Sequence, residues 1–193
     1  MGWFVFSGLL FVVSLIVAFC QYSDKWREPV YQIREDRLIQ TTGSTIDQAT
    51  EEQETTDVWV RYDVPLDDDL QKYIYKLCSE YKVDPALVMA VIEVESGFDP
   101  EKSGDGGKSL GLMQIYSTQH TERCIRLDAW NLFEPKANVR VGIDFLSELM
   151  ATGHDIEWCL SWYNGHGGDS CEYSKTVLNR AEIISESAMI MEG

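Results

Sequence analysis

Glu95 stands at the end of an apolar run and is the residue of this chain best placed for acid–base chemistry. The run from Ala86 to Val94 is apolar on nearly every side, which predicts a buried helix. Asp84 and Pro85 before it are typical of an N-cap residue and a first helical position. A carboxylate on the last turn of a buried helix is costly to ionise, so we expect a raised pKa for Glu95, as a general acid requires near neutral pH. The alternative is that Glu95 points into water beyond the helix.

Four short motifs follow one another along the second half of the chain. They are Glu-Ser-Gly-Phe-Asp-Pro at 95–100 with Gly-Leu-Met-Gln at 111–114, Leu-Phe-Glu-Pro at 132–135 with Asn-Val-Arg-Val-Gly at 138–142, Trp-Tyr-Asn-Gly at 162–165, and Tyr-Ser-Lys-Thr-Val-Leu at 173–178. In content and order they resemble the soluble lytic transglycosylase (SLT) family, whose third motif is Ala-Tyr-Asn-x-Gly. The resemblance implies a goose-type lysozyme fold. The loop between Glu95 and Gly111 is slightly longer than in the family, which leaves the roles of Ser103 and Ser109 open.

The resemblance implies cleavage of the β-1,4 bond between MurNAc and GlcNAc in peptidoglycan. Glu95 would protonate the leaving oxygen and then, as a carboxylate, take the proton from the muramyl 6-hydroxyl, which attacks C1 to give a 1,6-anhydro end. The same resemblance assigns six residues to the substrate groove, namely Ser96, Met113, Gln114, Tyr163, Asn164 and Tyr173. Tyr173 would place its hydroxyl near Glu95, and Gly111 would let the backbone approach a sugar because it lacks Cβ. Core packing is the alternative role of both tyrosines.

A hydrolase of the goose type on the same fold is one alternative function. A hydrolase of the usual kind needs a second carboxylate as nucleophile or base. Glu93 projects about 200° round the helix from Glu95 and cannot face the same bond. Asp99 and Asp105, both in loops, are the nearby candidates that could guide a water molecule. A non-catalytic module that binds the cell wall is the other alternative.

Charge and composition exclude several other classes. A formal net charge of −16 argues against nucleic-acid binding, because phosphates would find few cations. The same charge argues against holding an anionic wall polymer by attraction, so a shaped groove must bind it. His120, His154 and His166 are scattered without metal-ligand spacing, and we expect neither a metal nor a cofactor.

The N-terminal stretch predicts a membrane anchor over residues 1–22. Residues 3–20 carry no charge and would span about 27 Å as a helix. No basic residue precedes this run, as one would in a secretory signal, so we expect an uncleaved anchor, with a cleaved signal as the alternative. The expected function requires the catalytic domain on the cell-wall side and makes an envelope-spanning apparatus a candidate partner. The basic residues after the run, Lys25, Arg27, Arg34 and Arg37, favour the opposite orientation.

The rest of the chain predicts a linker and one mainly α catalytic domain. Residues 23–66 are expected to form a flexible acidic linker with an extended lead-in from Val58, and the domain is expected over 67–190. Besides the Glu95 helix, apolar spacing predicts helices over 69–81, 138–150, 155–163 and 173–187. No alternating run predicts a strand.

Four of the five cysteines lie in this domain. Cys78 and Cys159 fall on apolar helix faces, where a buried thiol is expected. Cys124 and Cys171 lie in or beside loops and could pair outside the cell. The sequence does not choose among the three connectivities that four cysteines allow.

Overall fold

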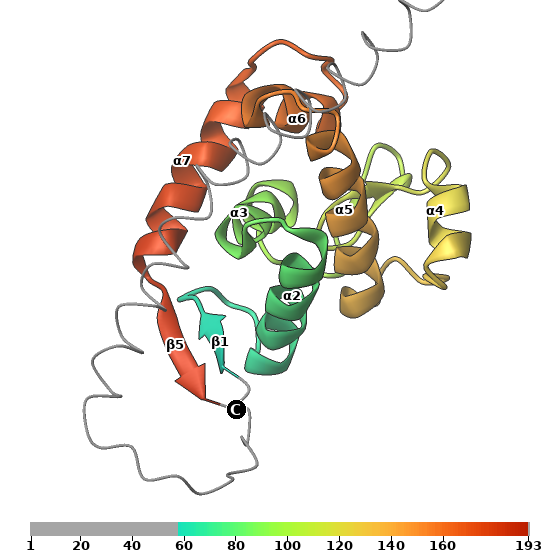
Figure 1. Ribbon diagram of the computed structural model, residues 1–193. Helices are drawn as coiled ribbons and strands as arrows, with labels where there is room; N and C mark the ends of the chain where they lie inside the picture. The colour runs from blue at the N-terminus through green and yellow to red at the C-terminus, as the bar shows by residue number, and fades with distance from the viewer. Residues whose placement is uncertain (1–57, 193) are drawn as a thin grey trace, which may run out of the picture. The chain divides into compact units, whose positions relative to one another are not determined.

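Six helices dominate residues 58–192, the part of the chain that the computed structural model describes (Figure 1). They are α2 (Asp68–Tyr81), α3 (Pro85–Ser96), α4 (Thr121–Arg126), α5 (Pro135–Met150), α6 (Ile156–Tyr163) and α7 (Glu172–Glu186). This confirms the predicted mainly α class. The predicted membrane segment over 1–22 and the acidic linker before Val58 lie outside the described residues. No helix within 58–192 is both long and apolar enough to cross a membrane.

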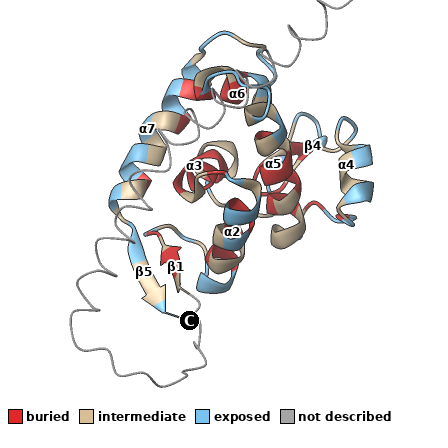
Figure 2. Cartoon of the chain, viewed as in Figure 1, coloured by how far each residue is buried: buried red, intermediate tan, exposed pale blue. Residues whose placement is uncertain are grey.

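Helix α3 runs through the centre of the domain and is its most deeply buried element (Figure 2). Asp84 caps it by accepting a hydrogen bond from the Ala86 backbone N–H at 2.8 Å, and Pro85 occupies the first turn, as predicted. All seven residues from Ala86 to Ile92 are buried. A buried Val, Leu, Ile or Met side chain contributes roughly 1.5–3 kcal/mol. The helix ends at Gly97, whose φ of +64° suits a residue without Cβ.

The folded part begins earlier than the predicted boundary at Asp67. Strand β1 (Val58–Arg61) pairs antiparallel with β5 (Met189–Glu192), so that Val58 lies opposite Glu192. Tyr62, directly after β1, is fully buried. The expected lead-in is therefore part of the domain. Strand β5 was not predicted, because four residues at the chain end are too few to show an alternating pattern.

Helix α5 begins three residues before its predicted start at Asn138, at Pro135. The Glu134 carboxylate caps it by accepting a hydrogen bond from the Lys136 N–H at 3.1 Å. The sequence Glu134-Pro135 is thus a start signal of the same kind as Asp84-Pro85.

A small three-stranded sheet follows α3 in place of the expected loop. Its strands β2 (Ser103–Gly104), β3 (Ser109–Leu110) and β4 (Ile115–Tyr116) pair in sequence order, each antiparallel to the next. Strands of two residues are too short for hydrophobic periodicity to reveal. The Gly-Leu-Met-Gln motif at 111–114 forms the connection between β3 and β4.

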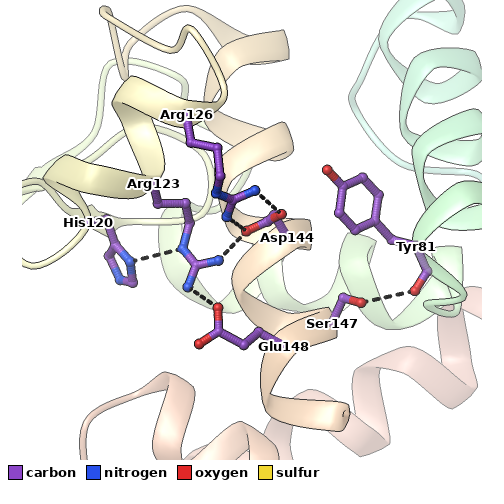
Figure 3. Close-up of polar contacts among 7 residues, drawn as sticks. All are labelled: Tyr81, His120, Arg123, Arg126, Asp144, Ser147 and Glu148. Carbon is purple, nitrogen blue, oxygen red and sulfur yellow. Dashed lines mark hydrogen bonds and ion pairs between the residues drawn. The ribbon is translucent and has the colours of Figure 1, made fainter.

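Charged side chains attach the short helix α4 to α5 (Figure 3). Arg123 and Arg126 both donate to the Asp144 carboxylate, and Arg123 also donates to Glu148 at 2.7 Å. Helix α4 has no buried residue, so these ion pairs replace an apolar contact. Tyr81 of α2 points toward the same carboxylate (Figure 3).

All four cysteines of the described chain are free thiols. Cys78 and Cys159 are buried, as predicted. Cys124 and Cys171, which the sequence left open as a pair, are half-buried and do not form a disulfide in this structure.

Candidate active site

Glu95 and Tyr173 meet where the last turn of α3 faces the first turn of α7. The Tyr173 hydroxyl donates a hydrogen bond of 2.6 Å to Glu95 Oε1, across 78 positions of sequence. The first turn of α7 is fixed by Ser174, whose hydroxyl accepts from the Cys171 N–H at 3.1 Å and donates to the Cys171 carbonyl at 2.8 Å. The hydrogen-bonded first turn of α7 therefore positions the Tyr173 hydroxyl beside the Glu95 carboxyl.

Burial raises the pKa of the Glu95 carboxyl from 4.5 to about 7. The hydrogen bond from Tyr173 lowers that pKa, because it stabilises the carboxylate, and the negative charge of Asp105 raises it. A group with this pKa exists in both protonation states near neutral pH. Glu95 can therefore give a proton in one step and accept one in the next.

The neighbouring acidic residues are in other environments. Glu93 accepts two hydrogen bonds from the Arg180 guanidinium, at 2.9 Å and 2.8 Å, and this ion pair joins α3 to α7. Asp99 accepts from the Glu101 N–H at 2.9 Å in an exposed turn. Asp105 has a positive φ of 51° and accepts from the Ser109 hydroxyl at 2.5 Å. Of these three, Asp105 is the one whose charge acts on Glu95.

Tyr163 connects the end of α6 to the motif at 111–114. Its hydroxyl donates to the Met113 carbonyl at 3.0 Å, and its ring stacks on Phe145 of α5 at a centroid distance of 5.2 Å. The Met113 side chain is fully buried. Burial raises the pKa of Tyr163, and the negative charge of Glu95 adds to the shift, so the phenol stays neutral beside the glutamate. Both predicted tyrosines therefore interact with Glu95. Tyr173 donates a hydrogen bond to it, and the charge of Glu95 acts on the Tyr163 phenol.

The other predicted groove residues make mostly local contacts. Gln114 has a positive φ of 46°, and its side-chain amide donates to the carbonyls of Gly111 at 2.9 Å and Lys102 at 3.1 Å. Ser96 donates its hydroxyl to the Ile92 carbonyl at 3.0 Å, within its own helix. Asn164 is half-buried and ends α6 directly after Tyr163. Gln114 therefore braces the small sheet, and the Ser96 hydroxyl is occupied by the helix backbone.

A family comparison agrees with this geometry. The family model described as Transglycosylase SLT domain matches residues 72–184, more than half of the 193-residue chain. The chain belongs to this family. The matched range includes Glu95, Tyr173 and every other predicted site residue. The SLT domain makes the chain a transglycosylase-type enzyme that acts on the glycan strands of peptidoglycan.

Asn138 is a structural residue of the SLT domain to which sequence reasoning gave no role. Its buried side chain accepts from the Met113 N–H at 2.8 Å and donates to the carbonyls of Leu110 at 2.8 Å and Leu132 at 2.7 Å. Gly111 lies against this side chain, since an added Cβ would clash with the Asn138 amide as well as with the Leu132 carbonyl oxygen. An asparagine inside an otherwise apolar helix face was the signal that could have identified it.

No three His, Cys, Asp or Glu side chains within residues 58–192 come together as metal ligands. His120 packs against Phe145 with ring centroids 4.5 Å apart, and His154 stacks on Trp158. Burial and the nearby Arg123 lower the pKa of His120. These two imidazoles therefore serve as packing groups.

Proposed function

We propose that this SLT domain is a lytic transglycosylase that cleaves the MurNAc–GlcNAc β-1,4 bond and leaves 1,6-anhydro-muramyl ends. The observation that carries the proposal is the half-buried Glu95 carboxyl, with a pKa of about 7, hydrogen-bonded to Tyr173 at 2.6 Å. Breaking this bond without water requires an acid for the leaving oxygen and then a base for the muramyl 6-hydroxyl, and one group can fill both roles. Glu95 has the pKa for both steps.

In the first step Glu95 donates its proton to the glycosidic oxygen, and the bond from that oxygen to muramyl C1 breaks. Positive charge develops at C1, and the Glu95 carboxylate left behind stabilises it. In the second step the carboxylate takes the proton of the muramyl 6-hydroxyl, whose oxygen bonds to C1. The acid is regenerated and no water is consumed.

Tyr173 holds the acid in position for both steps. Its hydroxyl occupies Glu95 Oε1, so Oε2 is the oxygen that exchanges the proton with the substrate. Because the tyrosine bond stabilises the carboxylate, it also keeps burial from raising the Glu95 pKa further. Burial and the charge of Glu95 hold the pKa of Tyr173 well above its ordinary value, so the hydroxyl remains a donor.

The remaining predicted groove residues support the substrate in this proposal. Met113 and Gln114 shape the groove through the backbone between β3 and β4, where Asn138 and Gly111 fix its course. Tyr163 positions the Met113 carbonyl, and Asn164 beside it offers an amide to sugar hydroxyls. Ser96 acts through its position next to Glu95, because its hydroxyl is bonded within α3.

One observation favours a second candidate function, hydrolysis by a water molecule. Asp105 raises the pKa of Glu95 by its charge, which makes it the loop carboxylate best placed to guide a water. The product would then carry a reducing muramic acid. The hydrogen bond from Ser109 to Asp105 favours a structural role for this carboxylate, so we place hydrolysis second.

The test is to digest purified peptidoglycan with the chain and weigh the released muropeptides. Anhydro products, each one water lighter than the hydrolysed counterpart, that disappear with Glu95→Gln would support the transglycosylase. Reducing ends would overturn it in favour of the hydrolase. Binding without cleavage, retained in Glu95→Gln, would mean a non-catalytic module of the cell wall.

We further propose that residues 1–22 anchor the enzyme in the membrane with its catalytic domain on the cell-wall side. Support comes from the uncharged stretch over 3–20 and from a substrate that lies outside the membrane. Such an enzyme could open the wall locally for an envelope-spanning apparatus. Protease added to intact spheroplasts should degrade the domain, and protection from that protease would contradict this orientation.

A further inference from the structure

Three aromatic rings line one face of α6 and the turn before it. His154 stacks on Trp158 with ring centroids 3.8 Å apart and an interplanar angle of 18°, and Trp158 lies 5.5 Å from Trp162. Positions 158 and 162 are one helical turn apart, so both indoles share a side of the helix. We call these three residues the α6 aromatic face.

Packing does not account for all of this face. The opposite side of α6, with Ile156, Cys159 and Leu160, is buried and forms the core contact of the helix. Trp162 is 47% exposed. Trp158 is half-buried and packs against the loop after α6, since a Cβ added to Gly168 would clash with its indole nitrogen. The loop at Gly168 thus fixes the Trp158 ring, while Trp162 remains open to solvent. A cluster of stacked aromatic rings that ends in an exposed tryptophan is typical of a binding surface, whereas a single exposed ring is not.

The α6 aromatic face continues from the candidate active site. Trp162 directly precedes Tyr163, which bonds Met113, and Asn164. The loop that follows leads to Tyr173, the partner of Glu95, and α6 lies beside the start of α7 (Figure 1). From Trp162 the face extends away from this end of the helix to Trp158, one turn or about 6 Å earlier at 1.5 Å per residue, and then to His154.

Charge restricts what this face can bind. Helix α6 and its N-cap contain two acidic residues, Glu157 and Asp155, and no basic residue. With a net charge of −16 for the whole chain, no attraction between charges would hold an anionic ligand here, so binding must come from contact with the rings. The β-linked pyranose rings of a glycan strand expose apolar C–H faces that stack on indole rings and require no cation. A saccharide therefore fits the surface better than nucleic acid or an anionic lipid.

We propose that the α6 aromatic face is a platform for the glycan strand, on which sugars beyond the cleaved bond stack against Trp162 and then Trp158. The proposal rests on the proposed function for the identity of the strand, and it deepens that function by adding a binding surface outside the groove. It also explains how an acidic enzyme holds its substrate without attraction between charges.

The experiment uses the full chain carrying Glu95→Gln, so that the strand is bound but not cut. The dissociation constant of this variant for the glycan strand is measured by sedimentation. The peptidoglycan used is first treated with an amidase, which removes the stem peptides. Adding Trp162→Ala should weaken binding about five- to tenfold, as for a stacked tryptophan in an interface. Adding Trp162→Phe should restore part of the loss, because it keeps an aromatic ring.

Trp130 provides the matched control, because it is 74% exposed and lies in the loop after α4, outside this face. Trp130→Ala should bind as the parent does. Equal binding by the Trp162→Ala protein, or an equal loss in Trp130→Ala, would overturn the proposal. A loss seen only with peptidoglycan that retains its stems would overturn it too and assign the face to peptides. Digestion by the unsubstituted chain tests the proposed function separately, since reducing ends there would leave a Trp162-dependent affinity for glycan intact.

Discussion

Two shielded carboxyl groups in this domain have opposite pKa shifts. Glu95 is half-buried beside the neutral donor Tyr173, and this burial raises its pKa to about 7. Asp144 is only 8% exposed, and burial alone would raise its pKa as well. Hydrogen bonds and charge from Arg126 and Arg123 outweigh burial there and hold the pKa of Asp144 below its ordinary value.

The difference shows that the group bonded to a shielded carboxyl decides whether that carboxyl can donate a proton near neutral pH. A tyrosine stabilises the carboxylate only in part, so Glu95 keeps a proton that it can donate near neutral pH. Two guanidinium groups keep Asp144 ionised, and its charge then attaches α4 to α5. One acid is suited to chemistry and the other to holding the fold.

Replacing Glu95 should have the largest effect. Glu95→Gln removes the proton donor while keeping the shape and the bond to Tyr173, and we expect the rate of muropeptide release to fall about a thousandfold. Circular dichroism should show an unchanged fold. A variant that retained more than a tenth of the activity would exclude Glu95 as the acid.

The same substitution should stabilise the protein above neutral pH. A folded-state pKa of about 7, above the ordinary 4.5, means that the contribution of Glu95 to stability is fully present below pH 4.5 and is lost as pH rises through 7. Gln has no charge to bury, so Glu95→Gln should gain about 2 kcal/mol over the parent above pH 7 and nothing near pH 4. Urea unfolding at both pH values measures this. An equal gain at both would contradict it.

Replacing Asp144 should affect the stability of the fold rather than catalysis. Asp144→Asn leaves two arginines without their carboxylate, and we expect the free energy of unfolding at pH 7 to fall by about 2 kcal/mol. Because the folded-state pKa of Asp144 is lowered, its contribution is present above the ordinary pKa of 3.8 and is lost as pH falls through the folded-state value. Urea unfolding at pH 7 and in acid should show the difference closing in acid.

Glu148 offers a control for the Asp144 substitution. Its side chain is 67% exposed and pairs with Arg123 alone. Glu148→Gln should therefore cost less than about 0.5 kcal/mol. A loss as large as that of Asp144→Asn would mean that burial does not distinguish the two ion pairs.

Removing the Tyr173 hydroxyl should raise the pKa of Glu95 and so widen its difference from the lowered pKa of Asp144. In Tyr173→Phe the bond that lowers the pKa of Glu95 is gone, so its pKa should rise above 7 and the alkaline limb of the kcat/KM profile should move to higher pH. The rate at the optimum should fall about tenfold, the effect of one hydrogen bond to a charged group. An alkaline limb that moved to lower pH would refute the assignment.

Replacing Asp105 should have the smallest effect. Asp105→Asn removes a negative charge that raises the pKa of Glu95, so the alkaline limb should move to lower pH by less than about one pH unit. The amide oxygen can still accept the bond from Ser109. Loss of activity as large as that of Glu95→Gln would instead support the hydrolase, with Asp105 guiding the water.

The sequence predicted the helices that carry the site, because each has its own local signals. Asp84-Pro85 started α3 correctly, and the apolar run placed Glu95 on its last turn. The Glu95–Tyr173 contact was predicted only through the family resemblance, since no local pattern joins residues 78 positions apart.

What the sequence could not predict depends on long-range pairing. The two-residue strands β2, β3 and β4 have no detectable period, and β5 is recognisable only by its partner β1. The roles of Asp144 and Asn138 likewise depend on groups brought to them by folding, namely two arginines of α4 and the backbone around Gly111. Sequence patterns place single elements better than they place the contacts between them.

The pairing of β1 with β5 determines when the domain can finish folding. Val58 has its partner at Glu192, so residues up to Glu192 must leave the ribosome before this ribbon can form. Until then Trp59 and Tyr62, both buried in the finished protein, have an incomplete cover. The four residues of β5 therefore complete this domain after Glu95, Tyr173 and the motif at 111–114 have all been synthesised.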